Sequence, residues 1–139
     1  MACPPDGARL MIIDTSALLA ILQREPEREA FLSCIETAAI RVISAASAVE
    51  TSMVVLSRSR EDGLRILEAL LRDLRIEQAP VTAGHVSFAV DAFRRFGKGR
   101  HPAGLNFGDC LSYAFAKATG EPLLFKGDDF SRTDIRRAV

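Results

Sequence analysis

The sequence predicts an α/β protein, a three-layer α/β/α sandwich around a central, mainly parallel sheet. Short apolar runs alternate with longer amphipathic stretches, as in folds whose parallel strands are connected by helices. The first run, Leu10 to Ile13, is apolar without alternation, which is typical of a strand covered on both faces. Asp14 directly follows this run. In open parallel sheets, ligands bind at the carboxyl edge of the strands, where Asp14 is expected to lie.

The first half of the chain continues this alternation. Apolar spacing predicts a helix beginning at Ala17, with Thr15 or Ser16 as its N-cap. A second helix over 30–38, a short strand over 41–44 and helical patterns over 46–57 and 61–74 follow. The last pattern carries a wide apolar stripe, which fits either a deep core position or a homodimer face.

The second half repeats the same arrangement and ends in a short tail. Asn106 is expected to open a helix and Gly120 to close it. The expected elements are, in order, a strand over 75–79, a helix over 82–96, a basic glycine-rich loop over 98–104, a helix over 106–119, a buried strand over 122–125, a turn over 127–129 and one helical turn near 134.

Length and composition limit the architecture and exclude several function classes. A chain of 139 residues fits one domain over 10–139, and residues 1–9 are expected to form a flexible extension because they show no periodicity. The formal net charge of zero gives no global electrostatic footprint of a nucleic-acid binder. Apolar runs are far shorter than the roughly 18 residues that a membrane span needs, and the N-terminus does not resemble a signal peptide, so we expect a cytoplasmic protein.

Acidic residues recur at the positions where helices follow strands. Glu50 and Asp109 lie near the starts of two expected helices, and Asp128 and Asp129 follow the last strand. Each has a structural explanation: Ser47 with Glu50 matches a capping box, Asn106 with Asp109 nearly does, and Asp is common in turns. Single residues therefore do not decide between capping and chemistry.

The acids are harder to explain together. Parallel topology would bring them to one edge of the sheet, where two charges about 4 Å apart repel by on the order of 4 kcal/mol at an effective dielectric near 20. Lys126 alone cannot neutralise four carboxylates. A divalent cation can, and oxygen ligands without nearby His or Cys favour Mg²⁺ or Mn²⁺ over Zn²⁺.

Four motifs carry a resemblance to a known family. They are Met11-Ile12-Ile13-Asp14-Thr15-Ser16-Ala17, Glu50 after the second strand, Asn106-Phe107-Gly108-Asp109-Cys110, and Leu123 to Phe130 followed by Thr133-Asp134-Ile135. In this order they resemble PIN-domain ribonucleases of the VapC toxin type over Leu10 to Ile135. The resemblance implies a PIN-like fold and an Mg²⁺- or Mn²⁺-dependent RNA endonuclease, the toxin of a toxin–antitoxin module. It also implies a small VapB-like antitoxin as partner, a homodimer, and Met11 as an alternative start.

The resemblance also assigns roles to particular residues. Asp14 and Asp109 would be the main metal ligands, assisted by Glu50. The fourth acid is expected to be Asp129, although Asp128 is close enough to replace it. Small hydroxyl residues of the family's site correspond to Thr15 and Ser16, whose other explanation is helix capping.

The sequence also offers candidates for RNA contact and for other functions. In the basic loop, Lys98 and Arg100 are the candidates for contacting RNA phosphates. A phosphatase with an aspartyl nucleophile also starts from a strand ending in Asp, but it needs a second Asp where this chain has Ser16. A catalytically inactive PIN-like module for nucleic-acid binding or interaction remains the alternative. Such a protein should have lost an acid, whereas all four positions are filled here.

Overall fold

A four-stranded parallel sheet forms the centre of the computed structural model, which describes residues 10–139. The predicted extension over residues 1–9 lies outside the described residues. The strands are β1 (Leu10–Ile13), β2 (Ile40–Ser44), β3 (Ile76–Ala79) and β4 (Leu123–Leu124), in the order β3-β2-β1-β4. β1 pairs with β2 from Leu10 opposite Ile40, and with β4 through Ile13 opposite Leu124. The predicted parallel sheet is confirmed, and its carboxyl ends share one edge.

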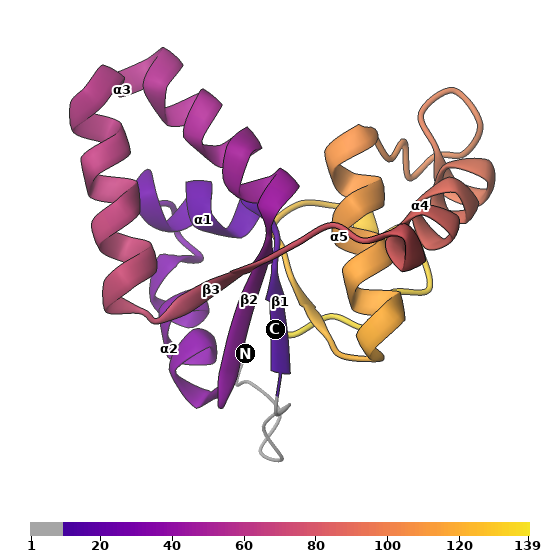
Figure 1. The fold of residues 1–139 in the computed structure, drawn as a ribbon, viewed down its shortest axis with the longest axis horizontal. Coiled ribbons are helices and arrows are strands. Elements are labelled where there is room, and N and C mark those ends of the chain that lie inside the picture. The colour runs from indigo at the N-terminus through magenta and orange to yellow at the C-terminus, as the bar shows by residue number, and fades with distance from the viewer. Residues whose placement is uncertain (1–9) are drawn as a thin grey trace.

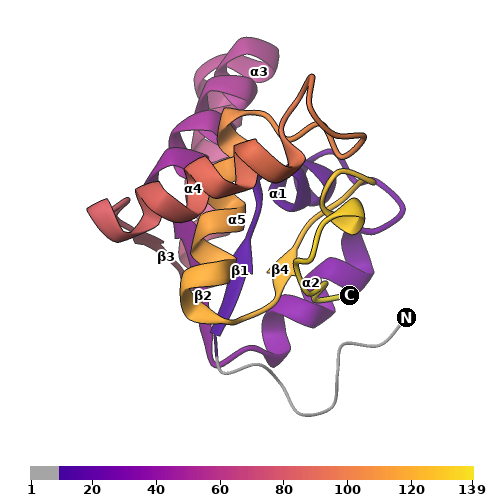
Figure 2. The same ribbon diagram turned by 90° about the vertical axis from the view of Figure 1, so that its right-hand side faces the viewer.

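Helices cover both faces of this sheet (Figures 1 and 2). Within β1, Ile13 is buried with the helices of one face and Ile12 with those of the other, which explains why this strand is apolar without alternation. On the first face lie α1 (Thr15–Leu22), α2 (Arg28–Thr37) and α3 (Ala45–Asp73), and on the second α4 (Ala83–Phe96) and α5 (Phe107–Thr119). The predicted three-layer sandwich is therefore confirmed. Among residues 10–139, no helix has the length and apolar character needed to cross a bilayer.

The two helical patterns over 46–57 and 61–74 form a single element. α3 runs through both and is interrupted at Arg60, whose backbone (φ 56°, ψ −149°) is not helical. The wide apolar stripe of the second pattern mainly faces the core, since Leu67 is fully buried and Leu64, Leu70 and Leu71 pack against the same cluster. Ile66 alone on this stripe is largely exposed.

The C-terminal segment returns along α5 and β4. Its helical turn is a 3₁₀ turn, η1 (Phe130–Arg132), so the prediction of a turn near Asp134 was wrong by a few residues. The turn starts earlier because the Phe130 ring is buried against Phe125, with centroids 5.2 Å apart. Asp134 instead accepts a hydrogen bond of 2.7 Å from the Tyr113 hydroxyl, which attaches the tail to α5.

Candidate active site

Asp14 lies at the carboxyl edge of the sheet, between β1 and α1. It is the N-cap of α1, so this helix begins at Thr15 rather than at the predicted Ala17, and the cap is neither Thr15 nor Ser16. Asp14 Oδ2 accepts hydrogen bonds from the Ser16 backbone N–H (3.0 Å) and from Ser16 Oγ (2.6 Å). Only 3% of Asp14 is exposed. A carboxylate this deeply buried needs several donors, and the start of a helix supplies them.

The two hydroxyl residues beside Asp14 attach α1 to neighbouring segments of the fold. Ser16 Oγ also accepts a hydrogen bond of 3.0 Å from the Lys126 backbone N–H, just beyond β4. Thr15 Oγ1 donates to the Ser47 carbonyl (3.2 Å) and accepts from Thr51 Oγ1 (3.0 Å), which joins α1 to α3. Both predicted residues therefore lie at the site, with their hydroxyls engaged by protein groups.

Glu50 does not act as a helix cap. The N-cap of α3 is Ser44, whose Oγ accepts a hydrogen bond of 2.9 Å from the Ser47 N–H, so the alternative explanation of Glu50 as part of a capping box with Ser47 is excluded. The Glu50 carboxylate instead lies against the backbone of Gly108 in the first turn of α5. A Cβ at Gly108 would come within 2.9 Å of both Cδ and Oε1 of Glu50. The glycine therefore leaves room for an acid that comes from α3.

Asp109 both caps its helix and faces the other acids. Asn106 Oδ1 accepts from the Asp109 N–H (2.9 Å) and Asp109 Oδ2 accepts from the Asn106 N–H (3.0 Å), a reciprocal capping box. Burial raises the pKa of Asp109 to about 7, against the hydrogen bond from Asn106, and the negative charges of Asp14, Asp129 and Glu50 raise the pKa further. The other three acids therefore lie close enough to Asp109 for their charges to act on it.

The last pair of acids is exposed in the turn after β4. The charge of Asp129 acts on Asp109. Asp128 contributes its backbone carbonyl, which accepts a 2.7 Å hydrogen bond from Ser131 Oγ. Lys126, in the same segment, pairs with Glu25 and with Glu27 (3.1 Å). This lysine is therefore already neutralised away from the acids at the sheet edge.

The carboxylates are close but not gathered around one point. Within residues 10–139, no group of three His, Cys, Asp or Glu side chains is arranged as a metal site. The donors nevertheless suit a hard divalent cation, because Asp14, Glu50 and Asp109 offer only oxygen atoms and Lys126 is paired with Glu25 and Glu27. Asp109 can keep its capping bond through Oδ2 and still offer Oδ1.

Comparison of the sequence with known proteins identifies the family of this chain. The PIN domain model matches residues 11–136. The chain is 49% identical over 125 residues to Ribonuclease VapC30 of Mycobacterium tuberculosis, covering 90% of this chain and 95% of that protein. It is 48% identical to Ribonuclease VapC of Mycolicibacterium smegmatis, covering 90% of this chain and 97% of that one. The chain belongs to the VapC family of PIN-domain proteins.

Solved structures agree with this membership at the level of the fold. The crystal structure of VapC20 from Mycobacterium tuberculosis, described as a sarcin-ricin loop cleaving toxin, aligns with a TM-score of 0.72 at 16% identity and covers 90% of this chain and 95% of that one. VapBC2 from Rickettsia felis, bound to a promoter DNA fragment, aligns with a TM-score of 0.74 at 15% identity, covering 92% and 96%.

The basic loop of this VapC-family chain is held by its own backbone. Lys98 N–H donates to the Leu105 carbonyl (2.9 Å), and Gly97 pairs with Leu105 in an isolated bridge. The Arg100 guanidinium lies 5.5 Å from the centre of the Phe93 ring. Both basic side chains are exposed on a loop that leads directly into α5 and Asp109.

Two residues at the site were not singled out from the sequence. Gly108 makes room for Glu50, and the Ser112 hydroxyl donates to Asp14 Oδ1 at 2.5 Å. A signal for Ser112 was present, since it is a polar residue in the otherwise apolar buried stretch of α5 and follows Asp109 by one helical turn. Nothing in the sequence indicated that it reaches a residue 98 positions away.

Proposed function

We propose that this protein is a Mg²⁺- or Mn²⁺-dependent RNA endonuclease, the toxin of a VapBC-type toxin–antitoxin module. The observation that carries the proposal is the placement of three acids beside one another at one edge of the sheet. Asp14 caps α1 and accepts a hydrogen bond from Ser112, one turn after Asp109 in α5, and the Glu50 carboxylate lies against Gly108, the neighbour of Asp109. The two curated relatives compared above are named ribonucleases, at nearly half identity over most of the chain. An inactive module would have no need to keep these charges together.

Asp14 and Asp109 would be the main ligands of the cation, with Glu50 and Asp129 assisting and Asp128 as an exposed neighbour. Such a cation, when bound, lowers the pKa of a water ligand and polarises a phosphodiester. The protein's own part is to hold the carboxylates in place: α1 is capped by Asp14, α5 by Asn106 and Asp109, and Gly108 admits Glu50. Anchoring Asp14 and Asp109 at helix starts keeps these two acids ordered despite their repulsion.

The test is cleavage of RNA by the purified protein with Mg²⁺ or Mn²⁺, with EDTA, and with Asp14→Asn or Asp109→Asn. Cleavage should require the cation and fall at least 100-fold in either variant, because each change removes a ligand charge without changing size. Asp73→Asn is the matched control, since Asp73 is exposed at the far end of α3. Undiminished cleavage in EDTA or in either site variant would contradict the proposal.

The partners form the second part of the proposal. We propose RNA as the substrate, contacted through Lys98 and Arg100, which implies action in the cytoplasm, and a small VapB-like antitoxin as inhibitor. VapBC2 of Rickettsia felis, which shares the fold, supports such a partner. A reading frame beside the gene that encodes a small DNA-binding protein, and loss of cleavage on co-expression with it, is the expected result. Cleavage that persists in the co-purified complex would argue against inhibition.

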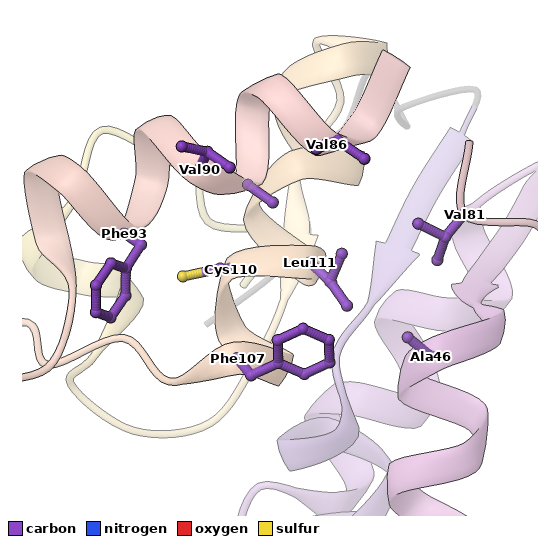
Figure 3. Close-up of a pocket in the computed structure, with 9 residues that line it drawn as sticks. Ala46, Val81, Val86, Val90, Phe93, Phe107, Cys110 and Leu111 are labelled. Atoms are coloured by element: carbon purple, nitrogen blue, oxygen red, sulfur yellow. The ribbon is translucent and has the colours of Figure 1, made fainter. Parts of the chain in front are cut away.

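Homodimerisation is the third part. An apolar groove of about 670 Å³ runs between α4 and the first turns of α3 and α5 (Figure 3). Exposed apolar side chains that gather in this way usually mark a protein contact, so we propose that a second copy covers the groove. It is lined by Ala46, Val81, Val86, Ala89, Val90, Phe93, Phe107, Cys110 and Leu111.

Light scattering after size exclusion tests this proposal. Val90→Lys should shift the protein from dimer to monomer, because it places a charge in the groove, which Val90 lines while half exposed. Ile40→Lys, at a similarly exposed apolar residue outside the groove, should leave the dimer intact. A wild-type monomer at micromolar concentration would contradict the proposal, as would a Val90→Lys dimer.

A further inference from the structure

The Asp14 carboxylate is saturated on one oxygen and open on the other. Oδ2 accepts two hydrogen bonds from Ser16, one from its N–H and one from its hydroxyl. Oδ1 accepts one, from Ser112 Oγ at 2.5 Å. Since each carboxylate oxygen offers about two lone-pair sites, Oδ1 is the oxygen with a site left for a ligand.

Ser112 belongs to a chain of three buried hydroxyls that ends on this oxygen. Ser47 Oγ lies 3.3 Å from Ser112 Oγ, and Ser44 Oγ donates to Ser47 Oγ at 3.1 Å. Each of the three serines is only 1% exposed. They come from the end of β2, the first turn of α3 and the middle of α5.

The direction of the hydrogen bonds in this chain follows from proton counting. A carboxylate can only accept, so Ser112 donates its one proton to Asp14. Ser112 can then only accept from Ser47, which in turn accepts from Ser44. All three O–H dipoles therefore point toward Asp14 Oδ1, and hydrogen bonds aligned in this way strengthen one another.

We infer that Ser112, supported by Ser47, is a positioning residue that fixes the orientation of Asp14 Oδ1 toward the cation site. The inference rests on the proposed function. Without the Ser112 hydroxyl, Oδ1 would lose its described hydrogen-bond donor, and the carboxylate could turn about its Cβ–Cγ bond as far as Ser16 permits. Hydrogen-bond partners of metal ligands typically change metal affinity by 10- to 100-fold.

The experiment is a Mn²⁺ titration followed by electron paramagnetic resonance, which counts free Mn²⁺ and needs no turnover. Ser112→Ala should weaken Mn²⁺ binding by about 10- to 100-fold, and Ser47→Ala by a smaller factor, because it acts one hydroxyl further away. Ser52→Ala is the matched control, since that helical serine donates only to the carbonyl of Ala48 (2.7 Å). It should bind within twofold of wild type.

A kinetic signature separates positioning from general damage to the fold. In Ser112→Ala, the Mn²⁺ concentration for half-maximal RNA cleavage should rise by the same factor as the Kd, while cleavage at saturating Mn²⁺ stays within a few-fold of wild type. If wild type binds Mn²⁺ and Ser112→Ala binds equally well, the inference is wrong and the proposed function stands. If wild type neither binds Mn²⁺ nor cleaves RNA, both fall. Loss of saturated activity with unchanged Kd also overturns the inference.

Discussion

Replacing Gly108 by alanine should stabilise the protein and impair it at the same time. The added Cβ would lie 2.9 Å from Glu50 Cδ and Oε1, and Oε2 is closer still. Ordinary van der Waals contact begins near 3.4 Å, so the Glu50 carboxylate must retreat by about 0.5 Å at Cδ and Oε1 and by more at Oε2. Since a misplacement of about 1 Å can cost 100-fold in rate, we expect RNA cleavage to fall by about 10- to 100-fold.

Stability should change in the opposite direction. Glu50 can move because its carboxylate is the end of a flexible side chain, whereas alanine is favoured over glycine in a helix by up to about 1 kcal/mol. Gly84 offers a matched control, because it is the second residue of α4 as Gly108 is of α5. A Cβ at Gly84 meets only Thr82 Oγ1 at an ordinary 3.6 Å. Gly84→Ala should therefore raise the Tm without changing cleavage.

A double-mutant cycle tests the cause directly. In a Glu50→Ala background there is no carboxylate for the added Cβ at position 108 to displace. Adding Gly108→Ala to this variant should therefore cause no further loss of cleavage. Wild-type activity in Gly108→Ala would refute the reasoning. An equal loss in both backgrounds would also refute it, because the effect would then not pass through Glu50.

Three further predictions concern charge and backbone. The pKa of Asp109 in the folded protein, about 7, lies above its usual 3.8, so the unfolded chain releases this proton first as pH rises and metal-free stability falls between about pH 4 and 7. Asp109→Asn cannot lose stability in this way. In EDTA, the Tm of this variant minus the wild-type Tm should therefore be larger at about pH 8 than at about pH 5, and a difference that shrinks with pH would contradict the raised pKa of Asp109. Replacing Lys98 and Arg100 together by alanine should make the plot of log binding constant against log salt concentration for single-stranded RNA less steep by about 1.4, at about 0.7 per phosphate contact. An unchanged slope would exclude these two residues as phosphate contacts. Arg60→Gly should melt no lower than wild type because Arg60 has φ 56°, whereas Arg58→Gly in the regular helix should cost about 1 kcal/mol.

The sheet and its acidic edge were predictable because strand and helix patterns are local. The apolar run before Asp14, the Asn106 cap and the Gly120 stop each show in a few neighbouring residues, and the structure confirms them as β1 and the two ends of α5. Parallel connectivity then brings the acids to one edge without further information.

The predicted starts of two helices were wrong because more than one neighbouring residue could serve as the N-cap. Two serines three positions apart could each cap α3, and Ser44 does so because β2 ends there, which leaves Glu50 free to reach Gly108. The same ambiguity moved the start of α1 to Thr15. Ser112 was missed because its contact with Asp14 joins two segments that only the folded chain brings together.

The central claim is that Asp14 and Asp109, with Glu50, share one divalent cation. Anomalous X-ray scattering from crystals soaked in Mn²⁺ tests it most directly. We expect a single strong peak at the carboxyl edge of the sheet, about 2.1 Å from an oxygen of both Asp14 and Asp109, and its loss in Asp109→Asn crystals. A peak elsewhere on the molecule, or none at millimolar Mn²⁺ in crystals of an active protein, would contradict the account.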